Sequence, residues 1–95
     1  MTKQVKEFLE SAEKSAKKSN ISSTMYAWEF EPGCFEIACN YERINTIFVY
    51  INGQWYLQLM YGDIYDPEAI TIRGKRSLCI SHNDAIANAM LLYSA

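Results

Sequence analysis

The segment from residue 2 to residue 20 has the apolar periodicity of an amphipathic helix. Its apolar residues recur at intervals of three and four and form one stripe: Val5, Phe8, Leu9, Ala12 and Ala16. Lysine and glutamate fill the other side, in several pairs of opposite charge four residues apart. Asn20 is a suitable C-terminal stop. The pattern predicts a helix that buries one stripe and exposes a charged, solvated face.

From residue 24 the apolar period changes to two, which is typical of β-strands. A hairpin that closes around Pro32-Gly33 would pair Phe30 with Phe35 and keep both apolar sets on one face. Tight turns at Glu42-Arg43 and Asn52-Gly53 continue that face into a third and a fourth strand, and Asn-Gly is the strongest hairpin signal in the chain. The expected core face carries Tyr26, Trp28, Phe30, Phe35, Ile37, Phe48, Tyr50, Trp55, Leu57 and Leu59.

The C-terminal third is expected to complete the sheet and to end in a helix. Pro67 marks a loop, which is followed by a fifth strand over 69–73 and a short sixth over 77–80. Ser81 is a good N-cap for the helix. The expected buried stripe of this helix is Ile86, Ala89, Met90 and Tyr93.

These elements predict an α+β fold in one domain, residues 1–95. It comprises an N-terminal helix, an antiparallel meander of four to six strands and a C-terminal helix, with the helices packed on one face of the sheet. A length of 95 residues suits one domain with a single core.

The face of the sheet opposite the helices is expected to be unusually apolar. In the hairpin around Asn52-Gly53, the residues that point to each of the two faces are largely apolar. Only one of these sets can face the core under the helices. The expected partner-binding residues on this face are Ile47, Val49, Ile51, Tyr56 and Met60, with Glu29 and Glu36 on the acidic first hairpin. An apolar patch of this kind is typical of a binding surface. A host protein, a second copy in a homodimer, or the fifth strand and the C-terminal helix could cover it.

Charge and cysteine content narrow the class of protein. The formal net charge is −2, which argues against a general nucleic-acid binder. The three cysteines, an odd number without C-x-x-C spacing, suit a reduced compartment. The N-terminus carries charges where a signal peptide has its apolar core, and no apolar run is long enough to span a bilayer. We therefore expect a cytoplasmic protein that does not insert into membranes.

Few residues are suited to catalysis or to metal binding. His82 is the only histidine, which excludes most catalytic constellations, and its ordinary role is an exposed imidazole at a helix end. Cys34 and Cys39 point to opposite faces of one strand, so no zinc site is expected. No phosphate-binding glycine loop is present, and we expect neither a metal nor a cofactor.

Two charged clusters remain as possible secondary contacts. Asp63 and Asp66 lie with Glu68 in a loop, where paired acids could serve a hydrolase or a hard cation but are more often ordinary turn residues. Arg73, Lys75 and Arg76 form a basic cluster that could contact a phosphate backbone or an acidic protein. A solvated hairpin tip is the ordinary interpretation of that cluster.

Together these features favour a non-enzymatic module that binds another protein and acts by occupying its surface. A compact acidic domain without catalytic groups has the overall character of the anti-CRISPR-like inhibitors that phages and mobile elements direct at host defence proteins. A bacterial immunity protein that blocks a toxin is an alternative in the same class. A nucleic-acid-binding accessory protein is favoured only if the basic cluster shares a surface with Lys3 or Lys6, and an enzyme only if His82 meets Asp63 or Asp66 in a cleft.

Overall fold

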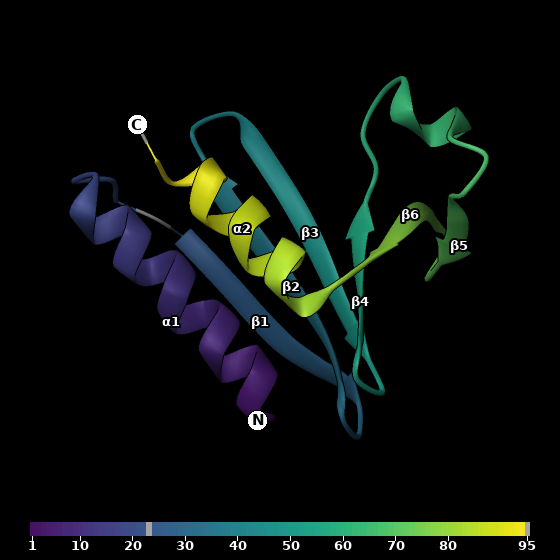
Figure 1. Ribbon diagram of the computed structural model, residues 1–95, viewed down its shortest axis with the longest axis horizontal. Helices are drawn as coiled ribbons and strands as arrows, with labels where there is room; N and C mark the ends of the chain where they lie inside the picture. Colours follow the sequence, from purple (N-terminus) through teal and green to yellow (C-terminus); the bar gives the residue numbers. More distant parts are fainter. Residues whose placement is uncertain (23, 95) are drawn as a thin grey trace.

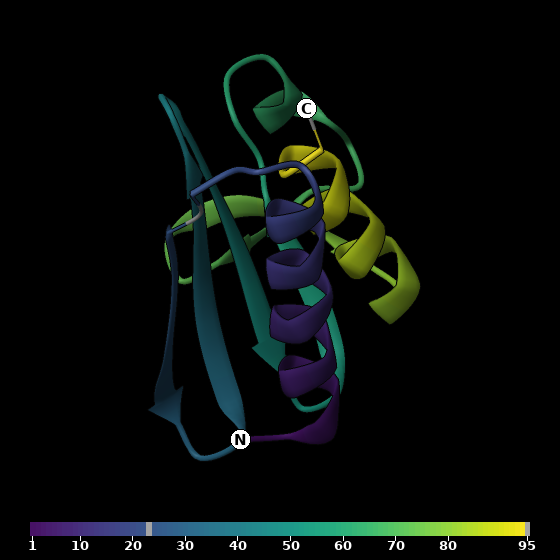
Figure 2. The same cartoon turned by 90° about the vertical axis from the view of Figure 1, so that its left-hand side faces the viewer.

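A computed structural model describes residues 1–22 and 24–94 as one antiparallel sheet with two helices on one of its faces (Figures 1 and 2). The helices are α1 (Lys3–Lys18) and α2 (His82–Leu92). The strands are β1 (Thr24–Glu31), β2 (Cys34–Tyr41), β3 (Ile44–Ile51), β4 (Gln54–Gln58), β5 (Ile70–Ile72) and β6 (Lys75–Ile80). Their order across the sheet is β1-β2-β3-β4-β6-β5, and a 3₁₀ turn, η1 (Asp63–Tyr65), lies in the loop before β5. The predicted α+β fold, including its sixth strand, is confirmed.

Residues with positive φ make the tight turns that set the strand registers. Asn52 and Gly53 have φ of 48° and 84°, the two left-handed conformations that a type I′ hairpin requires. Arg73 and Gly74 repeat the pattern with 50° and 81°, and they join β5 to β6. The registers predicted for β2 with β3, and for β3 with β4 over its observed length, are confirmed.

Both helices begin at a side-chain cap. The Thr2 hydroxyl accepts a hydrogen bond from the Val5 N–H at 3.3 Å, and the Ser81 hydroxyl accepts one from the Asp84 N–H at 3.0 Å. Each cap satisfies a backbone donor that the helix itself leaves unpaired, which is typically worth about 1 kcal/mol. The predicted stop after α1 is also confirmed, because Asn20 adopts a φ of 56°.

The core lies between the two helices and the inner face of β2, β3 and β4. Four of the five stripe residues predicted for α1 are fully buried, and Leu9 is partly buried. Phe8 is central: its ring lies 4.8 Å from that of Trp55 and 4.9 Å from that of Phe48. From α2 the buried side chains are Ala85, Ala89 and, at its end, Tyr93. Met90, which the sequence places in the buried stripe, is instead exposed, because the helix turns Ala85 and Ala89 toward the sheet.

A β-bulge in β1 changes the face that the sequence predicts for this strand. The register shifts between Glu29 and Glu31, so Phe30 is an extra residue in the ladder with β2. Glu29, and not Phe30, therefore lies opposite Phe35. Because side chains alternate between faces, one inserted residue moves every earlier side chain of the strand to the other side.

The prediction that Tyr26, Trp28 and Phe30 belong to the core is consequently wrong. Met25 and Ala27 pack against the core in their place. Tyr26 and Trp28 lie on the face away from the helices and are 64% and 41% exposed. The fold thus places large aromatic side chains on a surface where the sequence pattern predicted small and acidic ones.

Phe8 should be one of the costly core residues to truncate. We expect Phe8→Ala to lower the free energy of unfolding by about 3–5 kcal/mol, because it removes a buried ring that contacts two others. Leu91→Ala is the matched control: this side chain is 72% exposed, and its loss should change stability by less than about 0.5 kcal/mol. Urea denaturation followed by circular dichroism measures both, and equal effects would contradict the described core.

The three cysteines should differ sharply in reactivity. Burial raises the pKa of the Cys39 thiol to about 12, against a smaller opposing effect of its hydrogen bond with Tyr93. Cys34 is also buried, whereas Cys79 is exposed. Because the reactive form is an accessible thiolate, only Cys79 of the folded protein should react with a disulfide reagent at about pH 8. All three thiols should react in denaturant. Rapid modification of Cys39 in the folded protein would contradict this.

Candidate functional site

The β5–β6 hairpin covers part of the sheet face opposite the helices. In Figure 2 it extends to the side of the sheet away from α1 and α2. Val49 points to this side and is only 1% exposed, although it lies outside the main core cluster. Cys34, Ser77 and Ala69 are also buried outside that cluster. The strongly curled sheet therefore closes a second, smaller apolar layer on itself.

Arg73, at the tip of this hairpin, joins it to β1 and β2. Its guanidinium carbon lies 3.9 Å from the centre of the Phe30 ring and 5.5 Å from that of Trp28. Its Nε lies 3.3 Å from Oε2 of Glu36, and Oε1 of Glu36 accepts a hydrogen bond from the Trp28 indole at 3.3 Å. A cation held against two aromatic rings and a carboxylate is fixed in position, because each contact restricts the same side chain.

We define the aromatic cluster as Tyr26, Trp28, Phe30, Arg73 and Glu36. Trp28 and Phe30 make an edge contact with ring centres 6.1 Å apart. The two residues nearer the start of β1, Tyr26 and Trp28, remain substantially exposed. The cluster thus combines fixed geometry with exposed aromatic surface, which is the combination that a binding site needs.

The sequence assigned Tyr26, Trp28 and Phe30 to the core and so missed this cluster. The available signal was the Pro32-Gly33 turn, since Pro-Gly favours a type II turn whose twist suits a two-residue hairpin poorly. A bulge is one way in which a strand accommodates such a mismatch. The structure contains this bulge directly before the turn.

The predicted partner-binding residues are only partly accessible. Val49 is corrected from an exposed residue to a buried one, and the tip of the β5–β6 hairpin contacts Glu36, the residue opposite Val49 on β2. Ile47, Ile51 and Tyr56 are half-buried, and Met60 is exposed. The two predicted acidic residues separate: Glu36 is part of the aromatic cluster, whereas Glu29 is on the helix side and accepts a hydrogen bond from the Gly33 N–H at 3.0 Å.

The predicted basic cluster does not form one surface. Arg73 is engaged with Glu36, and Lys75 is exposed on the next strand. Arg76 donates to the backbone carbonyls of Ile64 and Asp66 at 3.2 and 3.4 Å. Because consecutive strand residues point to opposite faces, Lys75 and Arg76 cannot contact the same phosphate backbone side by side.

The two predicted acidic loop residues have ordinary roles in a turn. Asp66 accepts a hydrogen bond from the Glu68 N–H at 2.8 Å, an Asx turn, and Asp63 begins the 3₁₀ turn. Within the described residues no group of three or more His, Cys, Asp or Glu side chains is arranged to hold a metal ion.

His82 is placed differently from the expected exposed helix end. Its ring stacks on Trp55 with centres 5.8 Å apart. Its Nε2 lies 3.5 Å from Oε1 of Glu7, so its acidic neighbour comes from α1 and not from the loop that holds Asp63 and Asp66. The arrangement joins the start of α2 to α1 and to the core.

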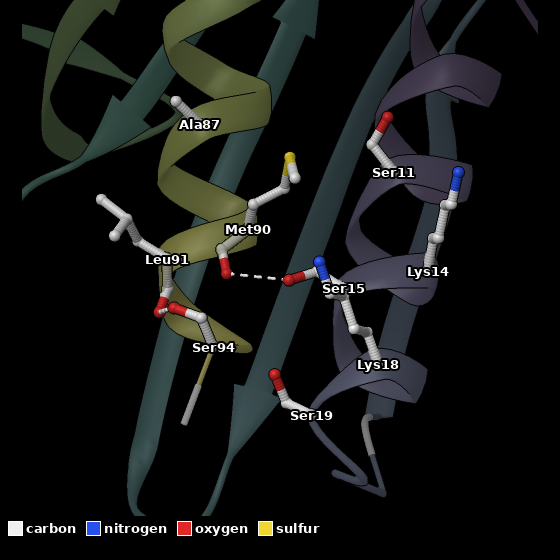
Figure 3. Close-up of a pocket in the computed structure, with 9 residues that line it drawn as sticks. All are labelled: Ser11, Lys14, Ser15, Lys18, Ser19, Ala87, Met90, Leu91 and Ser94. Carbon is white, nitrogen blue, oxygen red and sulfur yellow. Dashed lines mark hydrogen bonds between the residues drawn. The ribbon is translucent and has the colours of Figure 1, made fainter.

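A shallow groove of about 850 Å³ runs between the outer sides of the two helices (Figure 3). Lys14 and Lys18 of α1 lie on one side of it, and Met90 and Leu91 of α2 on the other. The Ser15 hydroxyl donates to the Met90 carbonyl at 3.1 Å and ties the two helices together across it. The groove is open, and serine and lysine side chains form its polar lining.

Comparison with protein-family models, with curated proteins and with solved structures found no match for this chain. Among the described residues no helix is both long and apolar enough to cross a membrane.

The closed second layer predicts opposite outcomes for two glutamate substitutions on the same sheet face. We expect Val49→Glu to unfold the protein or to destabilise it by several kcal/mol, because it buries a carboxylate without a partner. Tyr26→Glu should retain the native circular dichroism spectrum, since this position is exposed. A folded Val49→Glu variant would show that the face is open.

Proposed function

We propose that this protein is a non-enzymatic module that binds another protein through the aromatic cluster. The observation that carries the proposal is the exposure of Tyr26 and Trp28 beside an arginine that is already fixed in place. An exposed tryptophan on a small domain leaves apolar area in water, and covering it on binding is favourable.

The composition of the cluster fits the residues that dominate binding energy in protein interfaces. Tryptophan, tyrosine and arginine are the residue types most enriched at such positions. Here Arg73 holds its geometry before any partner arrives, so less conformational entropy is lost on association. Removing one such anchor typically costs about 2 kcal/mol or more of binding free energy, which is roughly a thirtyfold loss of affinity.

The charge around the cluster favours a protein partner over a nucleic acid. Glu36 neutralises Arg73, and Glu31 is exposed at the end of β1. Carboxylates at this position repel a phosphate backbone. The nucleic-acid hypothesis also required the basic cluster to form one surface, and the structure separates its members between different contacts.

Within this class we propose an inhibitor that occupies the surface of a host protein, of the kind that phages and mobile elements direct at host defence complexes. The support is the small acidic fold with a preorganised binding cluster. A bacterial immunity protein that blocks a toxin would use such a surface in the same way and is the alternative. Both act in the cytoplasm.

The test is specific capture with matched variants. Immobilised wild-type protein should retain a host protein that Trp28→Ser and Arg73→Ser fail to retain. Tyr61→Ser is the control, because Tyr61 is fully exposed on the loop after β4, outside the cluster, and its loss should change nothing.

The captured protein is then purified, and its affinity for each variant is measured by calorimetry. We expect at least about a tenfold loss for Trp28→Ser and Arg73→Ser. Equal binding by all variants, or a loss caused only by Tyr61→Ser, would place the contact elsewhere and contradict the proposal.

A further inference from the structure

The two edges of the sheet differ in how well they are protected. β5 is only three residues long, whereas β1 has eight residues and pairs with β2 on one side alone. Proteins usually block a long edge with lysine, proline or a covering segment, because free backbone groups pair readily with another chain. In β1 the acidic side chains and the bulge protect only the C-terminal end, at Glu29 and Glu31, and residues 24–28 contain no charged residue and no proline.

The strand registers identify which backbone groups of β1 are free. Tyr41 and Ile44 flank a two-residue turn and therefore form a hydrogen-bonded pair between β2 and β3. Hydrogen-bonded pairs alternate along an antiparallel ladder, so the backbone groups of the odd-numbered residues of β2 bond to β3. The backbone groups of its even-numbered residues bond to β1. The even-numbered partners on β1 include Tyr26 and Trp28. The N–H and C=O groups of Met25, Ala27 and Glu29 therefore point outward.

Nothing else in the described part of the chain pairs with this edge. No backbone hydrogen bond among those residues joins β1 to a segment other than β2. In Figure 2, β1 lies at the outer margin of the sheet, and both helices lie over strands further in. A second strand can therefore approach β1 without meeting α1 or α2.

We propose that β1 pairs antiparallel with β1 of a second copy of this chain, with Ala27 opposite Ala27 on a twofold axis. This register uses the regular part of the strand, residues 25–29, and leaves the bulge outside. It aligns the outward groups of Met25 with those of Glu29 of the partner copy. Met25, Ala27 and Glu29 contribute two outward backbone groups each, six from each copy, which makes this a modest interface that depends on concentration.

A second copy suits this edge because the two residues next to Ala27 are both aromatic. Tyr26 and Trp28 flank it, so self-pairing places an aromatic residue opposite an aromatic residue twice. Each Glu29 lies opposite Met25, and like charges do not meet. Other registers are less favourable. If Trp28 lay opposite Trp28, Tyr26 would have to pair with Phe30 at the bulge. If Glu29 lay opposite Glu29, two like charges would meet.

The dimer would also join two aromatic clusters. A twofold axis perpendicular to the sheet keeps the faces aligned, so both clusters lie on the same side of a continuous sheet. The dimer does not depend on the proposed function, because it requires only the backbone edge of β1.

Disulfide trapping tests the register directly. In a Cys79→Ser background, which removes the exposed thiol, Ala27→Cys should yield a covalent dimer on mild oxidation. The Cα atoms of a hydrogen-bonded antiparallel pair lie about 5.5 Å apart, within disulfide range. Glu29→Cys is the matched control and should stay monomeric, because the two copies of residue 29 lie about four strand residues apart.

The mass in solution, measured by sedimentation across about 10 μM to 1 mM, tests the dimer without any cross-link. Wild type should pass from monomer to dimer in this range. Ala27→Pro should weaken dimerisation at least about tenfold with an unchanged circular dichroism spectrum, because the lost N–H points outward.

A wild type that stays monomeric throughout the range overturns the proposal. Efficient trapping at residue 29 in place of residue 27 overturns the register, and a dimer that residue 27 fails to trap places the contact on another surface. If Ala27→Pro does not fold, the trapping result alone decides the matter.

Discussion

A sheet that is apolar on both faces must cover both, and two short helices cover only one of them. This constraint governs the whole structure. Phe8 and its neighbours on α1 close the inner face against Trp55 and Phe48. The outer face has no helix, so the sheet curls until Arg73 of the β5–β6 turn contacts Glu36, the residue opposite the buried Val49. The twist that all sheets possess is used here to form a second layer.

The closure of this second layer explains why Arg73 is engaged. It occupies a tight turn with positive φ, a position that usually leaves a side chain in solvent. The curl carries that turn across the outer face, where the guanidinium meets Phe30 and Glu36. A partner that binds Trp28 would thus contact a surface whose rigidity comes from a long-range contact. Loosening the hairpin would weaken both the fold and the binding surface.

Local signals predicted most of the fold but not the face of β1. Asn52-Gly53 favours a turn with two left-handed residues, which fixes the register of its hairpin. The apolar stripe from Val5 to Ala16 is compatible with only one buried face of the helix. In β1 both alternating sets can pack, because Met25 and Ala27 are as acceptable inside as the aromatic residues. One extra residue at the bulge decides between them, and its cause is the geometry of the Pro32-Gly33 turn together with β2. The aromatic cluster depends on the position of this bulge and could not be predicted without it.

The same bulge links the two surfaces proposed for binding. It turns Tyr26 and Trp28 outward, which creates the cluster, and it limits the regular part of the free edge to the residues around Ala27. Aromatic side chains beside a free edge favour pairing, because each backbone hydrogen bond then comes with apolar contact. A strand with the predicted register would have placed these rings under α1 and left an edge flanked by small and acidic side chains. The exposed aromatic surface and the shape of the unprotected edge therefore have one structural origin.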